Sequence, residues 1–495
     1  MNKKPFYITT TLPYVNADPH VGFAMEIIRA DAVARYRRLS GNEVFFNTGT
    51  DEHGAKLLND ARAAGRDVKD YVDEYAARFR LLKDKLNLSI DNFIRTTNPH
   101  HEMAAQEFWR LCDKNGYIYK KNYEIKYCVG CELEKTESEL NENGCCPIHP
   151  NKEIEIISEE NYFFKFSAFQ KPLLEFYEKS PDFVIPDFRF NEIKSFVSRG
   201  LQDFSISRLK SKMPWGIEVP GDPEHVMYVW FDALVNYISA IGWPDDVEKF
   251  NKWHVGNGGM VQYCGKDNNR QQSAMWQAML MAAGLPQSRH IVINGFIQSG
   301  GQKMSKSLGN VISPFDVIDE FKNVTDFPED VLRFVLLHDI PSFEDGDLTM
   351  ESIKKSYRAN LQDGLGNLVS RVMKMATTYF DTNVKWEEYI GDNNVFHNYP
   401  GEWDKAYDIF DLKLVVENIW KKVRALDVYI QTNEPYKKIK SNETSARKDV
   451  AYLLSHLLRT SYELEPFLPK TSLAVRELIR ENKMPEKPLF ARLNV

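Results

Sequence analysis

The sequence contains no long apolar run, no fixed-period repeat and no low-complexity tract. A membrane-spanning helix needs roughly 20 consecutive apolar residues, and no segment approaches that length. The apolar stretch near the start is interrupted by Thr9-Thr10-Thr11, which argues against a signal peptide or a transit peptide. With 43% hydrophobic residues among 495, the composition is that of a globular protein of several domains, which we expect in the cytoplasm.

An excess of basic residues is also absent. Lysine and arginine number 63, whereas aspartate and glutamate number 70, so the formal net charge is -7. Such a charge does not indicate a nucleic-acid-binding protein, although a local basic face can still bind a nucleic acid. Any case for RNA binding must therefore rest on motifs rather than on composition.

Cysteine is uncommon, and most of it is gathered in one segment. Four cysteines cluster beside a histidine, which favours a metal over a disulfide framework. Three of them and the histidine have the spacing Cys128-x2-Cys131-x14-Cys146-x2-His149, which suits tetrahedral zinc. Cys145 is an alternative third ligand, but Cys146 gives the paired two-residue gap. The two remaining cysteines are expected to be buried as small apolar side chains. They are Cys112 and Cys264.

Two short segments far apart in the sequence carry most information: Pro19-His20-Val21-Gly22, and Lys303-Met304-Ser305-Lys306-Ser307. The first follows a β-prone stretch at 6–12 and opens a helix with apolar residues every three or four positions. A second strand at 44–46 follows. Strand, helix and strand form one βαβ unit, which binds ligands where strands end and helices begin. Glycine at position 22 lets a nucleotide approach the backbone.

The lysine-serine segment has glycines on both sides and two lysines three residues apart. By itself, such a segment is more simply interpreted as a solvated basic turn. Such a loop can also close over a triphosphate and stabilise the charge that develops on leaving pyrophosphate. The presence of the histidine segment upstream favours the second interpretation.

In this order, the two segments resemble the ATP signatures of class I aminoacyl-tRNA synthetases. Further segments, at 11–16, 50–54, 229–237 and 265–267, resemble the methionyl-tRNA synthetase family. The resemblance covers nearly the whole chain, and the sequence is most similar to the bacterial branch of the family, which has a single zinc knuckle. It implies an α/β protein: a Rossmann-type parallel-sheet catalytic domain with an inserted zinc-knuckle domain, followed by an all-α anticodon-binding helical bundle.

The spacing of apolar residues predicts helices in the C-terminal bundle. An apolar stripe from Leu412 to Ile430 predicts one of them. Leu453 begins another, which Pro466 and Pro469 are expected to end. The sequence shows no extra β-barrel module of the kind that dimerises some members of the family, so we expect a monomer.

The five expected domains are the first half of the Rossmann domain (1–115), the connective insertion with the zinc knuckle (116–225), the second half of the Rossmann domain (226–325), a connector that contacts the tRNA stem (326–355) and the anticodon-binding domain (356–495).

The resemblance implies a methionine–tRNA ligase that uses ATP, Mg²⁺ and Zn²⁺ and acts on L-methionine and tRNA(Met). The ATP site implied is His20, Gly22, His53, Lys303, Met304, Ser305, Lys306 and Ser307, of which His20, Gly22, Lys303 and Lys306 are catalytic. The methionine site implied is Leu12, Tyr14, Asp51, Trp230, Ala233, Tyr237, Gln272 and Trp276, with Asp51 on the ammonium. The zinc ligands are Cys128, Cys131, Cys146 and His149, and the anticodon residues are Asn367, Arg371 and Tyr436.

Three positions depart from the family pattern. Phe23 replaces a second histidine, and losing a donor to a phosphate costs ~1.5–3 kcal/mol. Gln272 replaces a histidine that reaches toward the methionine sulfur, yet its amide can still donate an N–H. Tyr436 stands where tryptophan is usual, and a tyrosine can still stack on a base.

Three alternatives stay open at this point. A class I synthetase for another aliphatic amino acid is disfavoured by the compact insertion, because those enzymes carry large editing domains. A decayed synthetase that binds tRNA without charging it is motivated by Phe23 and Gln272, and the intact second signature opposes it. A nucleotidyltransferase of related fold that acts on a small metabolite would have no use for a long helical C-terminus.

Overall fold

A computed structural model of the chain describes residues 4–131, 133–135, 139–304, 309–380, 388 and 404–493. The chain forms two compact units. The sheet unit comprises Met1–Asp18, Glu43–Leu81 and Ile90–Ile293. The helical unit comprises Pro19–Asn42, Leu82–Ser89 and Asn294–Val495. The five domains expected from the sequence are a finer division, which stays a prediction.

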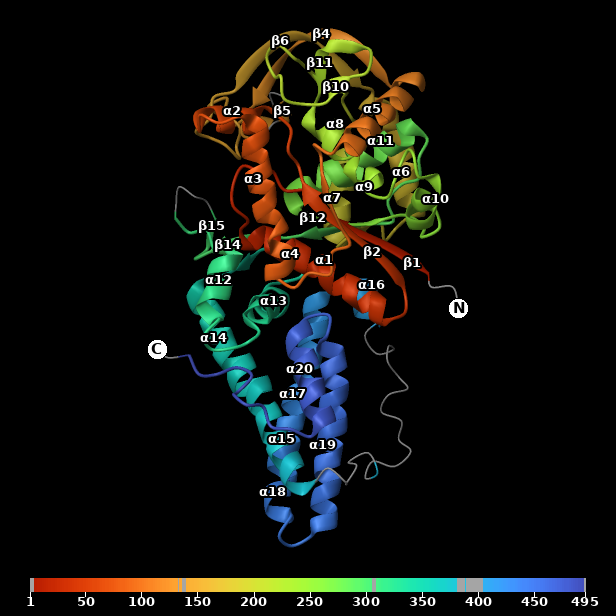
Figure 1. Ribbon diagram of the computed structural model, residues 1–495. Coiled ribbons are helices and arrows are strands. Elements are labelled where there is room, and N and C mark those ends of the chain that lie inside the picture. Colours follow the sequence, from red (N-terminus) through yellow and green to blue (C-terminus); the bar gives the residue numbers. More distant parts are fainter. Residues whose placement is uncertain are drawn as a thin grey trace. The chain divides into compact units, whose positions relative to one another are not determined.

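The sheet unit contains a central sheet whose strand order is β3-β2-β1-β12-β13-β7 (Figure 1). The pairings of β3 with β2, β2 with β1, β1 with β12 and β13 with β7 are parallel. Strands β1 and β13 are buried along nearly their whole length, as parallel strands covered on both faces should be. The predicted α/β class is therefore confirmed. The strands are β1 (Pro5–Thr10), β2 (Glu43–Thr50), β3 (Asn92–Arg95), β7 (Val184–Ile185), β12 (Val261–Gly265) and β13 (His290–Asn294).

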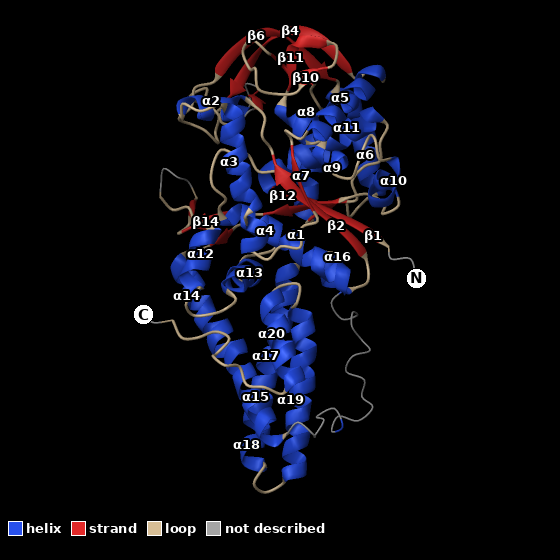
Figure 2. Ribbon diagram, viewed as in Figure 1, coloured by secondary structure: helices blue, strands red, loops and turns tan. Residues whose placement is uncertain are grey.

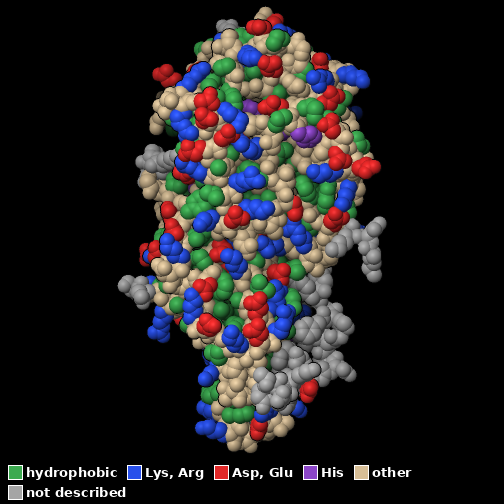
Figure 3. Space-filling view, in the orientation of Figure 1, with side chains coloured by type: hydrophobic (Ala, Val, Ile, Leu, Met, Phe, Trp, Pro, Cys, Tyr) green, Lys and Arg blue, Asp and Glu red, His purple; other side chains and the backbone are tan. Residues whose placement is uncertain are grey.

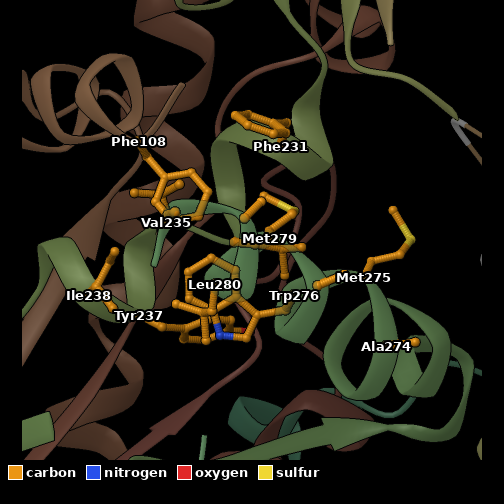
Figure 4. Close-up of a cluster of buried hydrophobic side chains, with 14 of the residues drawn as sticks. Phe108, Phe231, Val235, Tyr237, Ile238, Ala274, Met275, Trp276, Met279 and Leu280 are labelled. Atoms are coloured by element: carbon orange, nitrogen blue, oxygen red, sulfur yellow. The ribbon is translucent and has the colours of Figure 1, made fainter. Parts of the chain in front are cut away.

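Helices of the sheet unit contribute large apolar side chains to one core, which includes Phe108, Phe231, Tyr237 and Trp276 (Figures 2 and 4). Cys112 and Cys264 also lie there, fully buried, as predicted. The helices are α2 (Ala55–Ala63), α3 (Val68–Arg80), α5 (Pro99–Lys114), α6 (Gln170–Lys179), α7 (Asp187–Ser198), α8 (Val229–Ala233), α9 (Asn236–Ser239), α10 (Val247–Phe250) and α11 (Trp276–Ala283), with the shorter turns η2 (Phe166–Phe169), η3 (Asn251–Val255), η4 (Lys266–Asn268) and η5 (Gln271–Met275).

A long antiparallel hairpin lies in the first half of the predicted insertion. Its two strands, β4 (Ile118–Cys128) and β6 (Glu155–Phe164), pair in the register Lys120 to Tyr162, and the sheet order is β5-β4-β6-β8. Strand β6 ends at Phe164, and η2 begins two residues later. The remaining strands are β5 (Leu133–Lys135), β8 (Phe204–Ser205), β9 (Ser207–Leu209), β10 (Glu218–Val219) and β11 (Asp222–Met227).

The helical unit contains the helix predicted after the first strand and the predicted C-terminal bundle. In the bundle, α15, α17, α19 and α20 pack alongside one another (Figure 1). The helices are α1 (Val21–Leu39), α4 (Leu82–Lys85), α12 (Pro314–Phe321), α13 (Pro328–His338), α14 (Met350–Ser356), η7 (Tyr357–Gly366), α15 (Asn367–Tyr379), α16 (Asp404–Asp408), α17 (Leu412–Asn433), α18 (Pro435–Lys438), α19 (Glu443–Leu464) and α20 (Pro469–Glu481), and the strands are β14 (Ile297–Ser299), β15 (Gln302–Lys303) and β16 (Gly346–Asp347).

The apolar stripes of the bundle lie on helices as the sequence predicts, with two differences at the helix ends. Leu412, Val423 and Ile430 are buried on a single face of α17, as the three-to-four spacing requires. The following helix, α19, begins at Glu443, ten residues before Leu453, and it ends at Leu464, so Pro469 does not terminate it. Pro469 is the first residue of α20, a position where proline loses no helical hydrogen bond.

Charged side chains of both signs are interspersed over the face seen in Figure 3. This mixture agrees with a net charge of only -7 in 495 residues. Within the part of the chain that the structure describes, every helix is too short or too polar to cross a membrane.

Candidate functional site

The histidine signature caps the first helix of the helical unit. His20 is the N-cap of α1, and its Nδ1 accepts a hydrogen bond from the Gly22 backbone N–H at 3.0 Å. The Val21 N–H donates to the Ile312 carbonyl at 3.0 Å, which ties the helix start to a distant segment. A Cβ on Gly22 would lie 2.8 Å from the His20 ring. Glycine is therefore required here for the histidine geometry, in addition to the nucleotide approach that the sequence suggested.

The lysine-serine segment begins in a short hairpin of the same unit. Strands β14 and β15 are antiparallel and turn through Gly300 and Gly301, both at positive φ. The Gly301 N–H donates to Asp347 Oδ1 at 2.8 Å, and Lys303 is the last residue of β15. The Met304 methyl lies 3.8 Å from where a Cβ on Gly22 would stand. The two signatures thus meet, although Ser305, Lys306 and Ser307 lie outside the described residues.

Several residues predicted for the methionine side chain lie on consecutive elements of the sheet unit. Trp230 and Ala233 are on α8, Tyr237 is on α9, and Trp276 begins α11. The rings of Tyr237 and Trp276 are 5.9 Å apart between centroids, and both are buried in one aromatic cluster (Figure 4). Such walls suit a thioether, because sulfur–ring contacts are favourable by ~0.3–1.5 kcal/mol.

Gln272 is held by two neighbours in the π-helical turn η5. Its Nε2 donates to Tyr237 Oη at 2.6 Å, and its Oε1 accepts from Gln262 Nε2 at 2.8 Å. A side-chain amide has two N–H donors, so one donor is already used by Tyr237. The predicted donation to the methionine sulfur therefore depends on the second N–H alone.

The predicted ammonium partner lies beyond the carboxyl end of β2. Asp51 forms an isolated parallel bridge with Tyr14, and its N–H donates to the Pro13 carbonyl at 3.0 Å. Tyr14 Oη donates to the His53 carbonyl at 2.6 Å. Leu12, two residues after the end of β1, packs in a small cluster with Ile94 and Ala240.

A buried carboxylate that the sequence did not single out lies between two histidines. Asp232 Oδ2 is 2.7 Å from His53 Nδ1, and its Oδ1 is 2.8 Å from His101 Nε2. Burial would lower the pKa of His53, but the charge and hydrogen bond of Asp232 outweigh it and raise that pKa. Burial would raise the pKa of Asp232, but the charge of His53 and the bonds from both histidines lower it. No local spacing links these residues, so the sequence pattern held no signal for the trio.

The predicted zinc ligands come together in the insertion. Their ligand atoms all lie within 4.8 Å of one another, with Cys131 Sγ 3.4 Å from Cys146 Sγ and 3.2 Å from His149 Nδ1. The Cys145 Sγ instead donates to the Asn143 carbonyl at 3.8 Å. Three thiols and one imidazole at this separation fit a tetrahedral zinc ion, with Cys146 rather than Cys145 in the set. The full set is Cys128, Cys131, Cys146 and His149.

Zinc retention tests the ligand set. A Cβ on Gly130 would lie 2.5 Å from His149 Cγ, so Gly130→Ala should displace the imidazole and weaken zinc binding. Cys146→Ser should remove a ligand outright, whereas Cys145→Ser is the matched control. Metal analysis after dialysis should find about one zinc per chain in wild type and in Cys145→Ser, and clearly less in the other two. Equal zinc in Cys146→Ser and wild type would contradict the assignment.

The helical bundle offers an open groove at the predicted anticodon residues. Its volume is about 530 Å³. Arg371 reaches it from α15, and Tyr436, 45% exposed, reaches it from α18. Asn367 lies four residues earlier on α15 and is not among the described residues that line the groove. Arg371 also forms an ion pair with Asp427. The groove lining is Ser370, Arg371, Lys374, Met375, Ile430, Tyr436 and Met484.

Comparisons with known proteins agree with this geometry. The family model described as tRNA synthetases class I (M) matches residues 6–154 and 134–373. The methionine–tRNA ligase of Thermotoga maritima is 37% identical and covers 98% of this chain and 76% of its own length. That of Thermosynechococcus vestitus is 38% identical, with 95% and 89% covered.

Solved structures show the same likeness in three dimensions. Mycobacterium tuberculosis methionyl-tRNA synthetase in complex with methionyl-adenylate superimposes with a TM-score of 0.88 at 32% identity, and the match covers 99% of this chain and 100% of that one. The resemblance inferred from the motifs is therefore confirmed. The chain belongs to the class I tRNA synthetases of the methionine type, the family of the methionine–tRNA ligases.

Proposed function

We propose that this protein is a methionine–tRNA ligase, which activates L-methionine with ATP and transfers it to tRNA(Met). One observation carries the proposal: Gly22 and Met304, from two signatures far apart in the sequence, are neighbours in one unit. The relative solved with methionyl-adenylate supports the same first step. A cytoplasmic location and a monomeric state stay predictions from the sequence.

In the first step, an oxygen of the methionine carboxylate attacks the α-phosphorus of ATP. The bond to the leaving pyrophosphate breaks, and methionyl-adenylate remains. The step needs no protein nucleophile, so catalysis comes from positioning and charge stabilisation. His20 at the helix N-terminus contacts the phosphates, and Lys303 and Lys306 neutralise the pyrophosphate. Mg²⁺, when bound, adds positive charge at the same phosphates.

Methionine is recognised at both of its ends. The Asp51 carboxylate, 6% exposed, pairs with the α-ammonium. The side chain lies among Tyr237, Trp276 and Trp230, whose ring faces suit the flexible thioether. Gln272 fixes the Tyr237 hydroxyl and offers its second N–H to the sulfur. Because thioether sulfur is a weak acceptor, this last contact contributes to selectivity more than to affinity.

In the second step, the terminal ribose hydroxyl of tRNA attacks the carbonyl of the adenylate, and AMP leaves. The anticodon is read at the bundle groove. Tyr436 is exposed enough to stack on an unpaired base, an interaction of ~1–3 kcal/mol. Arg371 and Asn367 donate to base edges from successive turns of α15.

Amino-acid-dependent exchange of labelled pyrophosphate into ATP tests the proposal. The purified zinc-loaded protein should catalyse exchange with methionine and not with leucine or isoleucine. Exchange that leucine or isoleucine stimulates better would instead identify a synthetase for another aliphatic amino acid.

Anticodon recognition is tested by Arg371→Ala. We expect the KM for tRNA(Met) to rise about tenfold or more, as loss of a bidentate base contact costs ~1–3 kcal/mol. Pyrophosphate exchange without tRNA should stay unchanged. Arg480→Ala removes an exposed arginine from α20 and should leave both activities unchanged. An unchanged KM for tRNA in Arg371→Ala would exclude the groove as the anticodon site.

A further inference from the structure

Two sets of residues form the proposed methionine site, and they come from separate parts of the sheet unit. The ammonium set, Tyr14 and Asp51, lies at the carboxyl end of β2, where the Tyr14 hydroxyl donates to the carbonyl of His53, a residue of the proposed ATP site. The side-chain set includes Trp230 and Ala233 of α8. Asp232 stands between these two residues on α8 and points its carboxylate at His53. One buried carboxylate thus connects the two sets.

The connection continues to a third element. His101, on the first turns of α5 and 0% exposed, holds the second oxygen of Asp232 at 2.8 Å. On its other side, His101 Nδ1 lies 2.9 Å from Ser239 Oγ of α9, the short helix that also carries Tyr237. The Ser239 hydroxyl also donates to the Asn236 carbonyl at 3.4 Å, so the imidazole and the serine each have two polar neighbours. Buried polar networks that are fully satisfied fix a unique arrangement of their members.

We propose that Asp232 and His101 are positioning residues for methionine, which hold the ammonium set and the side-chain set of the site at their working separation. The inference rests on the proposed function and assigns roles to two residues that do not themselves touch the substrate. Asp232 acts through His53 and the backbone of α8. His101 acts one step further away, by fixing the second oxygen of Asp232.

Charge is part of this arrangement. The acidic groups that face His53 are Asp232 from α8, Glu102 from α5 and Glu52 from its own loop. Arg95 of β3 neutralises Glu52 through a 2.6 Å contact, so Asp232 is the anion that depends on His53. The raised pKa of His53 keeps the imidazole charged to higher pH. When His53 loses its proton, Asp232 loses the positive charge of this neighbour, and the link between His53 and α8 weakens.

Methionine-dependent pyrophosphate exchange distinguishes positioning from general stability. Asp232→Asn keeps the shape but loses the charge, and we expect the KM for methionine to rise about tenfold or more, with kcat at saturating methionine within about threefold. His101→Leu should raise this KM as well. His101→Gln, which retains a donor toward Asp232, should restore it to near the wild-type value.

A matched control is available in the same unit. His254 is equally buried and donates to the Pro286 carbonyl at 2.8 Å, away from the trio. His254→Gln should leave the KM for methionine unchanged, whatever it does to the unfolding midpoint. If His254→Gln raised this KM as much as His101→Leu, the effect would be one of stability, and the inference would be overturned.

The pH profile gives a second, independent readout. In wild type, kcat/KM for methionine should fall on the alkaline side as His53 loses its proton. In Asp232→Asn, burial is left to lower the pKa of His53, so the fall should move to lower pH. If the wild type is active and Asp232→Asn has the same KM for methionine and the same pH profile as the wild type, this inference is overturned and the proposed function stands. A wild type with no methionine-dependent exchange would overturn the proposed function and this inference with it.

Discussion

Alanine at position 22 is expected to slow methionine-dependent pyrophosphate exchange by about 10²–10³-fold, the size of effect that follows loss of a preorganised charge-stabilising group. The added Cβ would stand 2.8 Å from His20 Cε1 and 2.9 Å from Nδ1, closer than such contacts occur. His20 must then leave its place at the N-terminus of α1. The atoms that this Cβ would meet belong to His20 and Met304 and to no residue proposed for methionine binding, so the KM for methionine should stay within about threefold.

A second glycine of the helical unit provides the control. A Cβ on Gly364 would meet only the Ala359 carbonyl at 3.4 Å, which is an ordinary contact. Gly364→Ala should therefore exchange pyrophosphate at close to the wild-type rate. Retention of normal exchange by Gly22→Ala would mean that the His20 geometry is not needed for adenylate formation.

Replacing Arg333 by methionine is expected to destabilise the helical unit by about 3–5 kcal/mol, because it removes one partner of a buried ion pair together with the donors to two buried carbonyls. Arg333 and Asp31 are both fully buried and meet at 2.7 Å. The arginine also donates to the carbonyls of Pro466 and Phe467 at 2.8 Å, which joins α1, α13 and the α19–α20 connection. Burial alone would raise the pKa of Asp31, but its contacts with Arg35, Arg333 and Ser89 lower this pKa to about 2.

Urea unfolding with hydrogen exchange of α1 and α13 amides measures this loss. Since the folded pKa of Asp31 lies below its unfolded value, its contribution is present above about pH 4 and is lost as pH falls toward 2. The double variant Asp31→Asn/Arg333→Met should lose less than the sum of the single losses. Arg480→Met, at an exposed position, should change stability by less than about 0.5 kcal/mol. A similarly small change in Arg333→Met would contradict the account.

Local patterns in the sequence predicted several parts of the fold. The three-to-four spacing of apolar residues located α17, and the strand–helix–strand pattern located β1, α1 and β2. The zinc ligand spacing selected four residues that do come together. Each of these features is set by neighbours within a few turns or one hairpin, so periodicity and turn residues are sufficient to reveal it.

Other features depend on contacts between distant segments. Asp232 meets a histidine on each side, at His53 and His101, and no period links the three positions. The two hydrogen-bond partners of Gln272, the acceptor Tyr237 and the donor Gln262, are likewise not indicated by any local spacing. Pro469 was expected to end a helix and instead begins one. Proline occurs both after the end of a helix and in its first turn, so its presence alone does not determine which of the two it marks.

Charging of tRNA(Met) by the purified, zinc-loaded protein is the most direct test of the proposed ligase activity. With labelled methionine, ATP and Mg²⁺, label should enter tRNA(Met), and an altered anticodon should greatly reduce the incorporation. Folded, zinc-loaded protein that binds tRNA(Met) but never incorporates methionine would exclude this activity. That result would mean that Phe23 and Gln272 mark a synthetase that has lost catalysis and kept only binding.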